Sequence, residues 1–97
     1  MTKEDYRSSK AYNYLLELLV ATNDKAQLAE ILAALMTENE QQELVNRIRI
    51  FALLDQGVTQ REISAQLGVG IATVSRGAKA FGQHQIEALL PSIGDEV

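Results

Sequence analysis

The sequence of 97 residues contains no cysteine, one histidine and no apolar segment long enough to cross a membrane. The absence of cysteine excludes disulfides and thiolate metal sites, so redox chemistry does not constrain the compartment. Residues 1–10 are polar and charged, with no apolar region behind a basic start. We therefore expect neither a signal peptide nor a membrane span, and the default expectation is a soluble cytoplasmic protein.

The chain also lacks an excess of positive charge. It carries 9 Lys and Arg against 13 Asp and Glu, which gives a formal net charge of -4. Proteins that neutralise phosphates usually carry a basic excess, so this total argues against a nucleic-acid partner. However, residues 59–85 hold Arg61, Arg76 and Lys79 against Glu62 alone, a local charge of +2, and the rest of the chain sums to -6. Local charge therefore keeps nucleic acid among the candidate partners.

Length and composition indicate one folded domain. The chain is 46% hydrophobic and 23% charged, which is typical of globular proteins. Its length leaves room for one domain, residues 1–97. So small a chain buries only about two-thirds of its unfolded surface, and a homodimer that shares a core is one route to stability.

Helical periodicity dominates, and almost nothing alternates with period two. The sequence predicts an all-α fold of about six helices. The first covers residues 11–20, and residues 22–24 interrupt it and can cap a second helix, whose apolar residues are Leu28, Ile31, Leu32 and Leu35. The others are expected at residues 37–56, 60–67, from 70 or 71 to about 80, and 86–90. We expect the first two helices to be mostly core, because their apolar residues form continuous stripes. The last residues, 92–97, are predicted to be a frayed acidic tail.

The clearest motif is a helix-turn-helix at about residues 59–80. Two capping boxes, Thr37-Glu38-Asn39-Glu40 and Thr59-Gln60-Arg61-Glu62, predict the starts of two helices. Gly57 supplies the left-handed conformation that ends many helices, the next short helix stops at Gly68 in the turn, and small Ser64 suits a close helix crossing. The alternative is that Gly68 merely joins two packed helices, as in many all-helical proteins.

In a helix-turn-helix the second helix enters the major groove and the first crosses the DNA backbone. Ala72 and Thr73 can contact a thymine methyl, and Thr73 and Ser75 can bond bases, phosphates or water. Arg61 can reach a guanine edge or a phosphate. The predicted DNA-binding residues are Arg61, Gly70, Ile71, Ala72, Thr73, Ser75 and Lys79.

The sequence contains little that could support a catalytic site. His84 lies in a polar segment with no cysteine or serine motif around it, which is typical of a solvated histidine. Glu38, Glu40 and Glu43 fit the favourable interaction of acids with the positive first turn of a helix better than a metal or acid–base site. We predict no catalytic residue, no metal and no enzyme.

Several segments resemble the bacterial Trp repressor family. The resemblance covers about residues 28–80, and its segments are Leu35-Met36-Thr37, Asn46-Arg47-Ile48-Arg49-Ile50, Gln60-Arg61-Glu62-Ile63 and Gly70-Ile71-Ala72-Thr73-Val74-Ser75-Arg76-Gly77. The last is the most specific. The resemblance implies an intertwined homodimer of six-helix chains that binds operator DNA, with L-tryptophan as corepressor and no other cofactor, and controls genes of tryptophan biosynthesis or transport.

The same resemblance implies a ligand pocket. The indole would lie between the guanidinium groups of Arg47 and Arg76, and Arg76 would also pair with the carboxylate. The ammonium would meet carbonyls around Ala34 and Met36, with Thr37 adjacent, and Gly77 would let the ring approach the backbone. The alternatives are an ion pair of Arg47 with Glu43 and a phosphate contact for Arg76.

Two positions depart from this family. Ala80 stands where the family has a serine beside the ligand's ammonium, and Lys79 where it has an asparagine. Loss of one hydroxyl partner corresponds to about 1 kcal/mol, a fewfold weaker affinity. Two alternatives therefore stay open: a related DNA-binding protein with another effector or none, and a helical protein-interaction module.

Overall fold

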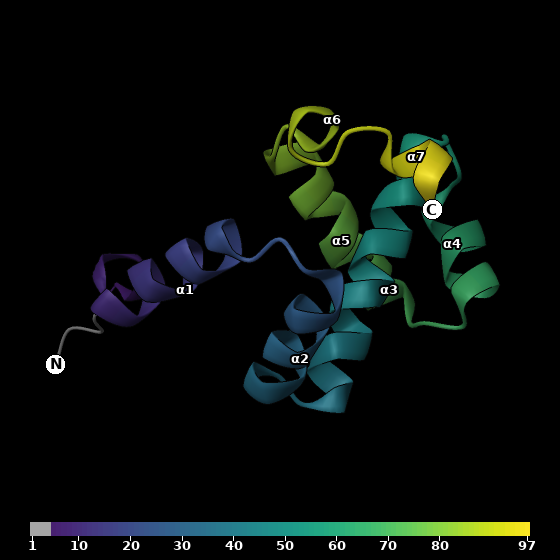
Figure 1. Ribbon diagram of the computed structural model, residues 1–97. Helices are drawn as coiled ribbons and strands as arrows, with labels where there is room; N and C mark the ends of the chain where they lie inside the picture. Colours follow the sequence, from purple (N-terminus) through teal and green to yellow (C-terminus); the bar gives the residue numbers. More distant parts are fainter. Residues whose placement is uncertain (1–4) are drawn as a thin grey trace, which may run out of the picture. The chain divides into compact units, whose positions relative to one another are not determined.

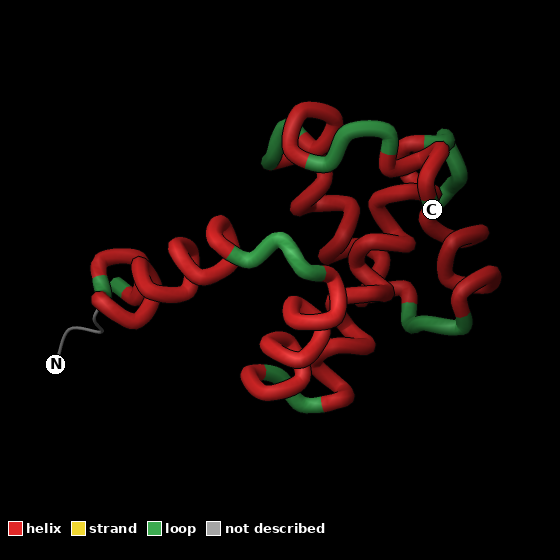
Figure 2. Tube along the Cα trace, viewed as in Figure 1, coloured by secondary structure: helices red, strands yellow, loops and turns green. Residues whose placement is uncertain are grey.

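The computed structural model describes residues 5–97, and within this range it contains helices and loops but no strand (Figures 1 and 2). The elements are η1 (Tyr6–Ser8), α1 (Lys10–Ala21), α2 (Lys25–Leu35), α3 (Glu38–Asp55), α4 (Gln60–Leu67), α5 (Ile71–Gln83), α6 (Ile86–Leu89) and α7 (Ile93–Glu96). The predicted all-α fold is confirmed. No helix of the described residues is both long and apolar enough to cross a membrane.

The chain divides into two compact units, Met1–Glu38 and Asn39–Val97, called here the first and second unit. The first unit carries α1 and α2, each of which begins at a side-chain cap. The Ser9 hydroxyl accepts a hydrogen bond from the backbone N–H of Tyr12, and the Asp24 carboxylate accepts one from Ala26. Thr22 donates its hydroxyl to the Leu18 carbonyl at the end of α1, at 2.7 Å. The predicted break between the first two helices, at residues 22–24, is confirmed.

The expectation that α1 and α2 are mostly core is wrong for the single chain. Neither helix contains a buried residue. Val20 is 87% exposed, Tyr14 is 67% exposed and Leu35 is 60% exposed. Periodicity located the apolar stripes correctly, but a stripe becomes core only when another surface covers it.

The second unit has two buried clusters on opposite sides of α3. The first cluster joins Ile50 of α3, Ile63 of α4 and Val74 of α5, all 0% exposed. The second cluster contains Phe51, Ala52, Ile86 and Ile93. Neighbouring residues of α3 contribute side chains to both clusters. Therefore α4 and α5 pack on one side of α3, and the C-terminal segment packs on the other.

Gly77 allows α5 to lie close to α3. It is buried, and a Cβ atom built on it would lie 2.8 Å from Cγ2 of Ile50, far inside van der Waals contact. Absence of a side chain at this position therefore serves helix packing.

The predicted frayed tail at residues 92–97 is wrong. Ile93, in α7, is only 6% exposed and packs in the second cluster. The Gln56 side-chain amide donates to the Gly94 carbonyl at 2.6 Å, which ties this segment to the end of α3. Ile93 was the signal in this segment, and burial of its side chain favours the ordered short helix over a frayed tail.

Candidate functional site

The helix-turn-helix forms as predicted from α4, a three-residue turn and α5. The Thr59 hydroxyl accepts from the backbone N–H of Glu62 at 3.2 Å and so caps α4. Gly68 ends α4 with φ of 68°, the left-handed region in which glycine has no steric penalty. Ile63 and Val74 are buried together with Ile50, which fixes the two helices on α3.

Two side-chain hydrogen bonds add to this packing. Ser64 donates its hydroxyl to the carbonyl of Val69 at 2.6 Å, which ties α4 to the turn. Ser75 donates to Oε1 of Gln60 at 2.9 Å, which ties the second turn of α5 to the start of α4. The size of Ser64 was a signal in the sequence, but the role of Gln60 was missed, because its partner lies 15 residues away.

The predicted DNA-binding residues lie mainly on the exposed side of this motif. Ile71 is 52% exposed, and Thr73 is half-buried. The other exposed members of the set are Arg61, Gly70, Ala72, Ser75 and Lys79. The bond between Ser75 and Gln60 brings the first turn of α4, with Arg61, beside the second turn of α5. Ser75 uses its proton on Gln60, so its oxygen remains an acceptor for water or another donor.

Arg47 and Arg76 line one small pocket between α3 and α5. Its volume is about 170 Å³, and its other lining residues are Glu43, Asn46, Ile50 and Thr73. The Arg47 guanidinium carbon lies 5.9 Å from the centre of the Phe51 ring, and Nη2 of Arg76 lies 3.5 Å from the Thr73 hydroxyl oxygen. The structure thus brings the two predicted arginines together.

Three other predicted ligand residues, Ala34, Met36 and Thr37, belong to the first unit, at and just beyond the end of α2. Their part in the pocket stays a prediction. Gly77 follows Arg76 on α5, and its Cβ direction faces Ile50 rather than open space.

The alternative ion pair between Arg47 and Glu43 is absent from the described part of the chain, where the ion pair found is Arg7 with Asp5 at 3.2 Å. The backbone N–H and the guanidinium of Arg7 lower the pKa of the Asp5 carboxyl. The first-turn interpretation of Glu43 is also wrong. Because α3 begins at Glu38, Glu43 lies in its second turn and faces the pocket.

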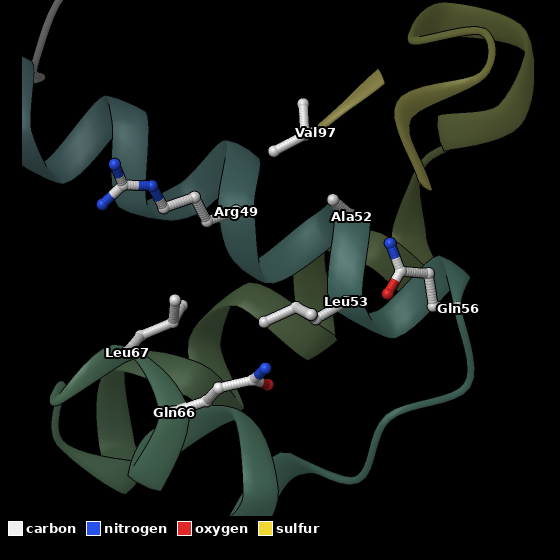
Figure 3. A pocket seen from close by; sticks show the side chains of 7 residues that line it. All are labelled: Arg49, Ala52, Leu53, Gln56, Gln66, Leu67 and Val97. Atoms are coloured by element: carbon white, nitrogen blue, oxygen red, sulfur yellow. The ribbon is translucent and has the colours of Figure 1, made fainter. Parts of the chain in front are cut away.

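A second pocket, of about 220 Å³, lies between α3, α4 and the C-terminal residue (Figure 3). Leu53 of α3 points toward Gln66 and Leu67 of α4, and Arg49 and Val97 lie at its edge. None of the predicted site residues lines it. Residues 5–97 also contain no group of three or more His, Asp or Glu side chains placed to hold a metal, and His84 is exposed at the end of α5.

A buried three-helix junction, a left-handed turn glycine and an exposed basic second helix define a helix-turn-helix DNA-binding regulator. The family model described as Trp repressor protein matches residues 10–90. The chain belongs to the Trp repressor family and is a transcriptional repressor, because this is a family of regulators rather than of enzymes.

Curated relatives agree with this assignment, and each is named Trp operon repressor homolog. The protein of Xylella fastidiosa (strain M23) is 33% identical over 82 residues, 84% of this chain and 89% of the relative. That of Aliivibrio fischeri (strain MJ11) is 36% identical, with 78% and 71% covered. That of Vibrio atlanticus (strain LGP32) is 40% identical, with 69% of each covered. No solved structure matches the chain at a significant level.

Proposed function

We propose that L-tryptophan activates this repressor and that its operators control genes of tryptophan biosynthesis or transport. The protein would act in the cytoplasm. The observation that carries the proposal is that Arg47 and Arg76 line one pocket, while Arg76 belongs to the helix that carries most of the predicted DNA surface. A ligand that contacts Arg76 would therefore act directly on α5. The name that the relatives share, Trp operon repressor homolog, points to the same effector.

The chemistry of the pocket suits an aromatic amino acid. Guanidinium groups stack on aromatic faces, and an indole between Arg47 and Arg76 would gain about 0.5–2 kcal/mol from each contact. The ligand carboxylate would pair with Arg76. Its ammonium would meet carbonyls around Ala34 and Met36, next to Thr37, because the C-terminal end of a helix carries partial negative charge.

The first unit supports the homodimer in this proposal. It contains an apolar groove of about 750 Å³, lined by Ala11, Tyr14, Leu15, Leu18, Leu19, Ile31, Leu32, Ala34, Leu35 and Met36. Ten apolar residues line this groove, and neither helix contains a buried residue. Such an exposed apolar surface is typical of one chain of an obligate dimer when it is seen without its partner. A second copy that covers it would bring two helix-turn-helix motifs together.

Two motifs in one dimer would contact two successive major grooves, about 34 Å apart, on a palindromic operator. The motif is basic while the rest of the chain is acidic. Non-specific affinity for DNA would therefore be modest, and tight binding would depend on the geometry of the two motifs. L-tryptophan would act by setting that geometry.

Calorimetry with L-tryptophan tests the effector. We expect saturable binding, and we expect Arg76→Ala and Arg47→Ala each to remove most of the affinity. Arg49→Ala is the matched control, since Arg49 lies on the same helix as Arg47 but lines the other pocket. The absence of heat at millimolar ligand would overturn the corepressor assignment and favour a repressor with another effector or none.

Selection from a random duplex pool, with and without L-tryptophan, tests DNA recognition. We expect a palindromic site enriched only with ligand, and a steep loss of affinity with added salt. Arg61→Ala should weaken the complex and reduce the salt slope by about 1 for each phosphate that Arg61 neutralises, whereas Arg49→Ala should not. Failure to enrich any duplex under either condition would favour a protein-interaction module.

A further inference from the structure

Helix α5 contacts both buried clusters of the second unit. Its first half contributes Val74 to the first cluster, which holds the helix-turn-helix on α3. Its second half contributes Ala80 and Phe81, which are half-buried and pack against the second cluster. The centre of the Phe81 ring lies 6.0 Å from the centre of the Phe51 ring of α3, at an interplanar angle of 52°. The direction of α5 therefore depends on two attachments, and the helix-turn-helix supplies only the first.

The second attachment is closed by residues that follow α5 in the sequence. Ile86 of α6 and Ile93 of α7 are each 6% exposed and complete the second cluster. The Gln56 amide, at the end of α3, anchors α7 by its hydrogen bond to the Gly94 carbonyl. The C-terminal segment thus holds Phe81 in its place, and through Phe81 it holds the second half of α5.

Gly77 lies between the two attachments, where α5 approaches Ile50 of α3 most closely. Each residue of a helix advances about 1.5 Å, so Phe81 lies about 6 Å along the axis on one side of Gly77 and Ala72 about 7.5 Å on the other. If α5 rotates about Gly77, a displacement of about 1 Å at Phe81 moves Ala72 by a similar distance in the opposite direction. Such a shift breaks contacts to base edges, because hydrogen bonds need a donor–acceptor distance of about 2.7–3.2 Å.

We infer that Phe81 is a positioning residue for DNA recognition, because it fixes the direction of α5 and so the place at which Ala72 and Thr73 meet the base edges. This inference rests on the proposed recognition of an operator through α5. It couples the docking of α7 on α3 to operator affinity, although no residue of α7 belongs to the predicted DNA surface. Phe81 carries no charge, so it contributes nothing to the non-specific attraction of the chain to phosphates.

Fluorescence anisotropy with two labelled duplexes of equal length, at saturating L-tryptophan, tests the inference on the full-length chain. One duplex is the site that selection enriches, and the other is an unrelated sequence. We expect Phe81→Ala to weaken binding of the enriched duplex about tenfold, as for the loss of one base contact, and to leave binding of the unrelated duplex and the salt slope unchanged. Ile93→Ala, which acts through the second cluster, should give the same selective loss at about threefold.

Two further variants separate positioning from a general loss of stability. Phe81→Leu keeps an apolar side chain against the second cluster and should recover most of the affinity for the enriched duplex. Leu89→Ala changes a residue of α6 that is 65% exposed and should bind both duplexes as the wild type does. Circular dichroism at the assay temperature checks that each variant is folded, because unfolding would weaken both complexes alike.

The outcomes separate this inference from the proposed function. If Phe81→Ala is folded and weakens both duplexes equally, or neither, the positioning role is overturned and operator recognition stands. If Phe81→Ala is unfolded, a selective loss in Ile93→Ala supports the role, and its absence overturns it. If selection enriches no duplex, or the wild type binds both duplexes equally, operator recognition and the role of Phe81 are overturned together.

Discussion

Ile50, Ile63 and Val74, in the second unit, are completely shielded from solvent by their own chain, whereas neither α1 nor α2 of the first unit contains a buried residue. Both units are rich in apolar side chains at helical spacing. The difference is that α3, α4 and α5 cover one another, while the ten residues of the first unit's groove line an open surface and none of them is buried. Amphipathic periodicity shows which face of a helix is apolar and tends to be buried. It does not show which other surface packs against that face.

The two units therefore suit two different tasks of a repressor, DNA recognition and dimer formation. The second unit holds the helix-turn-helix and the two arginines on its own core, so one chain can build a complete recognition element. In the proposed homodimer, the first unit carries the surface that a second copy would cover. Stability of the first unit should therefore depend on protein concentration, as it does for obligate dimers.

The largest expected effect comes from a charge in the apolar groove. Leu18→Asp replaces a groove-lining leucine with a carboxylate. Covering that carboxylate would cost about 3 kcal/mol or more in each chain, from reduced apolar burial and from desolvation. Sedimentation equilibrium should find the wild type as a dimer and this variant as a single chain at the same concentration.

The matched control is Asn13→Asp, which introduces the same charge on an exposed position of α1 outside the groove. It should remain a dimer. A wild type that sediments as one chain at micromolar concentration would mean that something other than a second copy covers the groove.

A smaller effect tests whether the core of the second unit extends to the end of the chain. Ile93→Ala removes a side chain packed against Phe51, Ala52 and Ile86. We expect a loss of about 2 kcal/mol in the free energy of unfolding, at the low end for a buried isoleucine because α7 is short and lies at the end of the chain. Urea unfolding monitored by circular dichroism measures it.

Leu89→Ala is the control, since Leu89 is 65% exposed and should change stability by less than about 0.5 kcal/mol. Equal losses in the two variants would show that α7 does not dock on α3. The frayed tail expected from the sequence would then be correct.

Features of the fold that depend only on residues close together in the sequence were predictable. The cap at Thr59 and the end of α4 at Gly68 required only neighbouring residues, and both lie where the sequence placed them. Features that depend on distant partners were not predictable. Ile93 finds its contacts on α3, about 40 positions earlier, and the Ser75 hydroxyl finds Gln60. An acidic sequence around Ile93 says nothing of the surface it meets.

The candidate site divides in the same way. The resemblance paired Arg47 with Arg76, and the structure places both in one pocket. Glu43 was assigned to the first turn of its helix, because several acids follow Thr37 in the sequence. That Glu43 lines the pocket became clear only once the position of α5 beside α3 was known. The parts of the predicted pocket at Ala34, Met36 and Thr37 remain predictions.

The smallest effect concerns the closest approach in the second unit. Gly77→Ala places a methyl group 2.8 Å from Cγ2 of Ile50, and such overpacking costs about 1–3 kcal/mol. Alanine also favours a helix interior over glycine by about 1 kcal/mol. The net result should be a loss of about 1 kcal/mol, measured by urea unfolding.

Gly82→Ala separates these two terms, because Gly82 lies on the same helix with nothing within 4 Å of its Cβ position. That variant should gain about 0.5–1 kcal/mol from helix propensity alone. In a double-mutant cycle, Ile50→Ala removes the methyl group that meets Gly77, so the two substitutions together should cost less than their sum. Additive losses would mean that α5 does not lie against α3 at Gly77, and would remove the physical reason for a glycine beside Arg76.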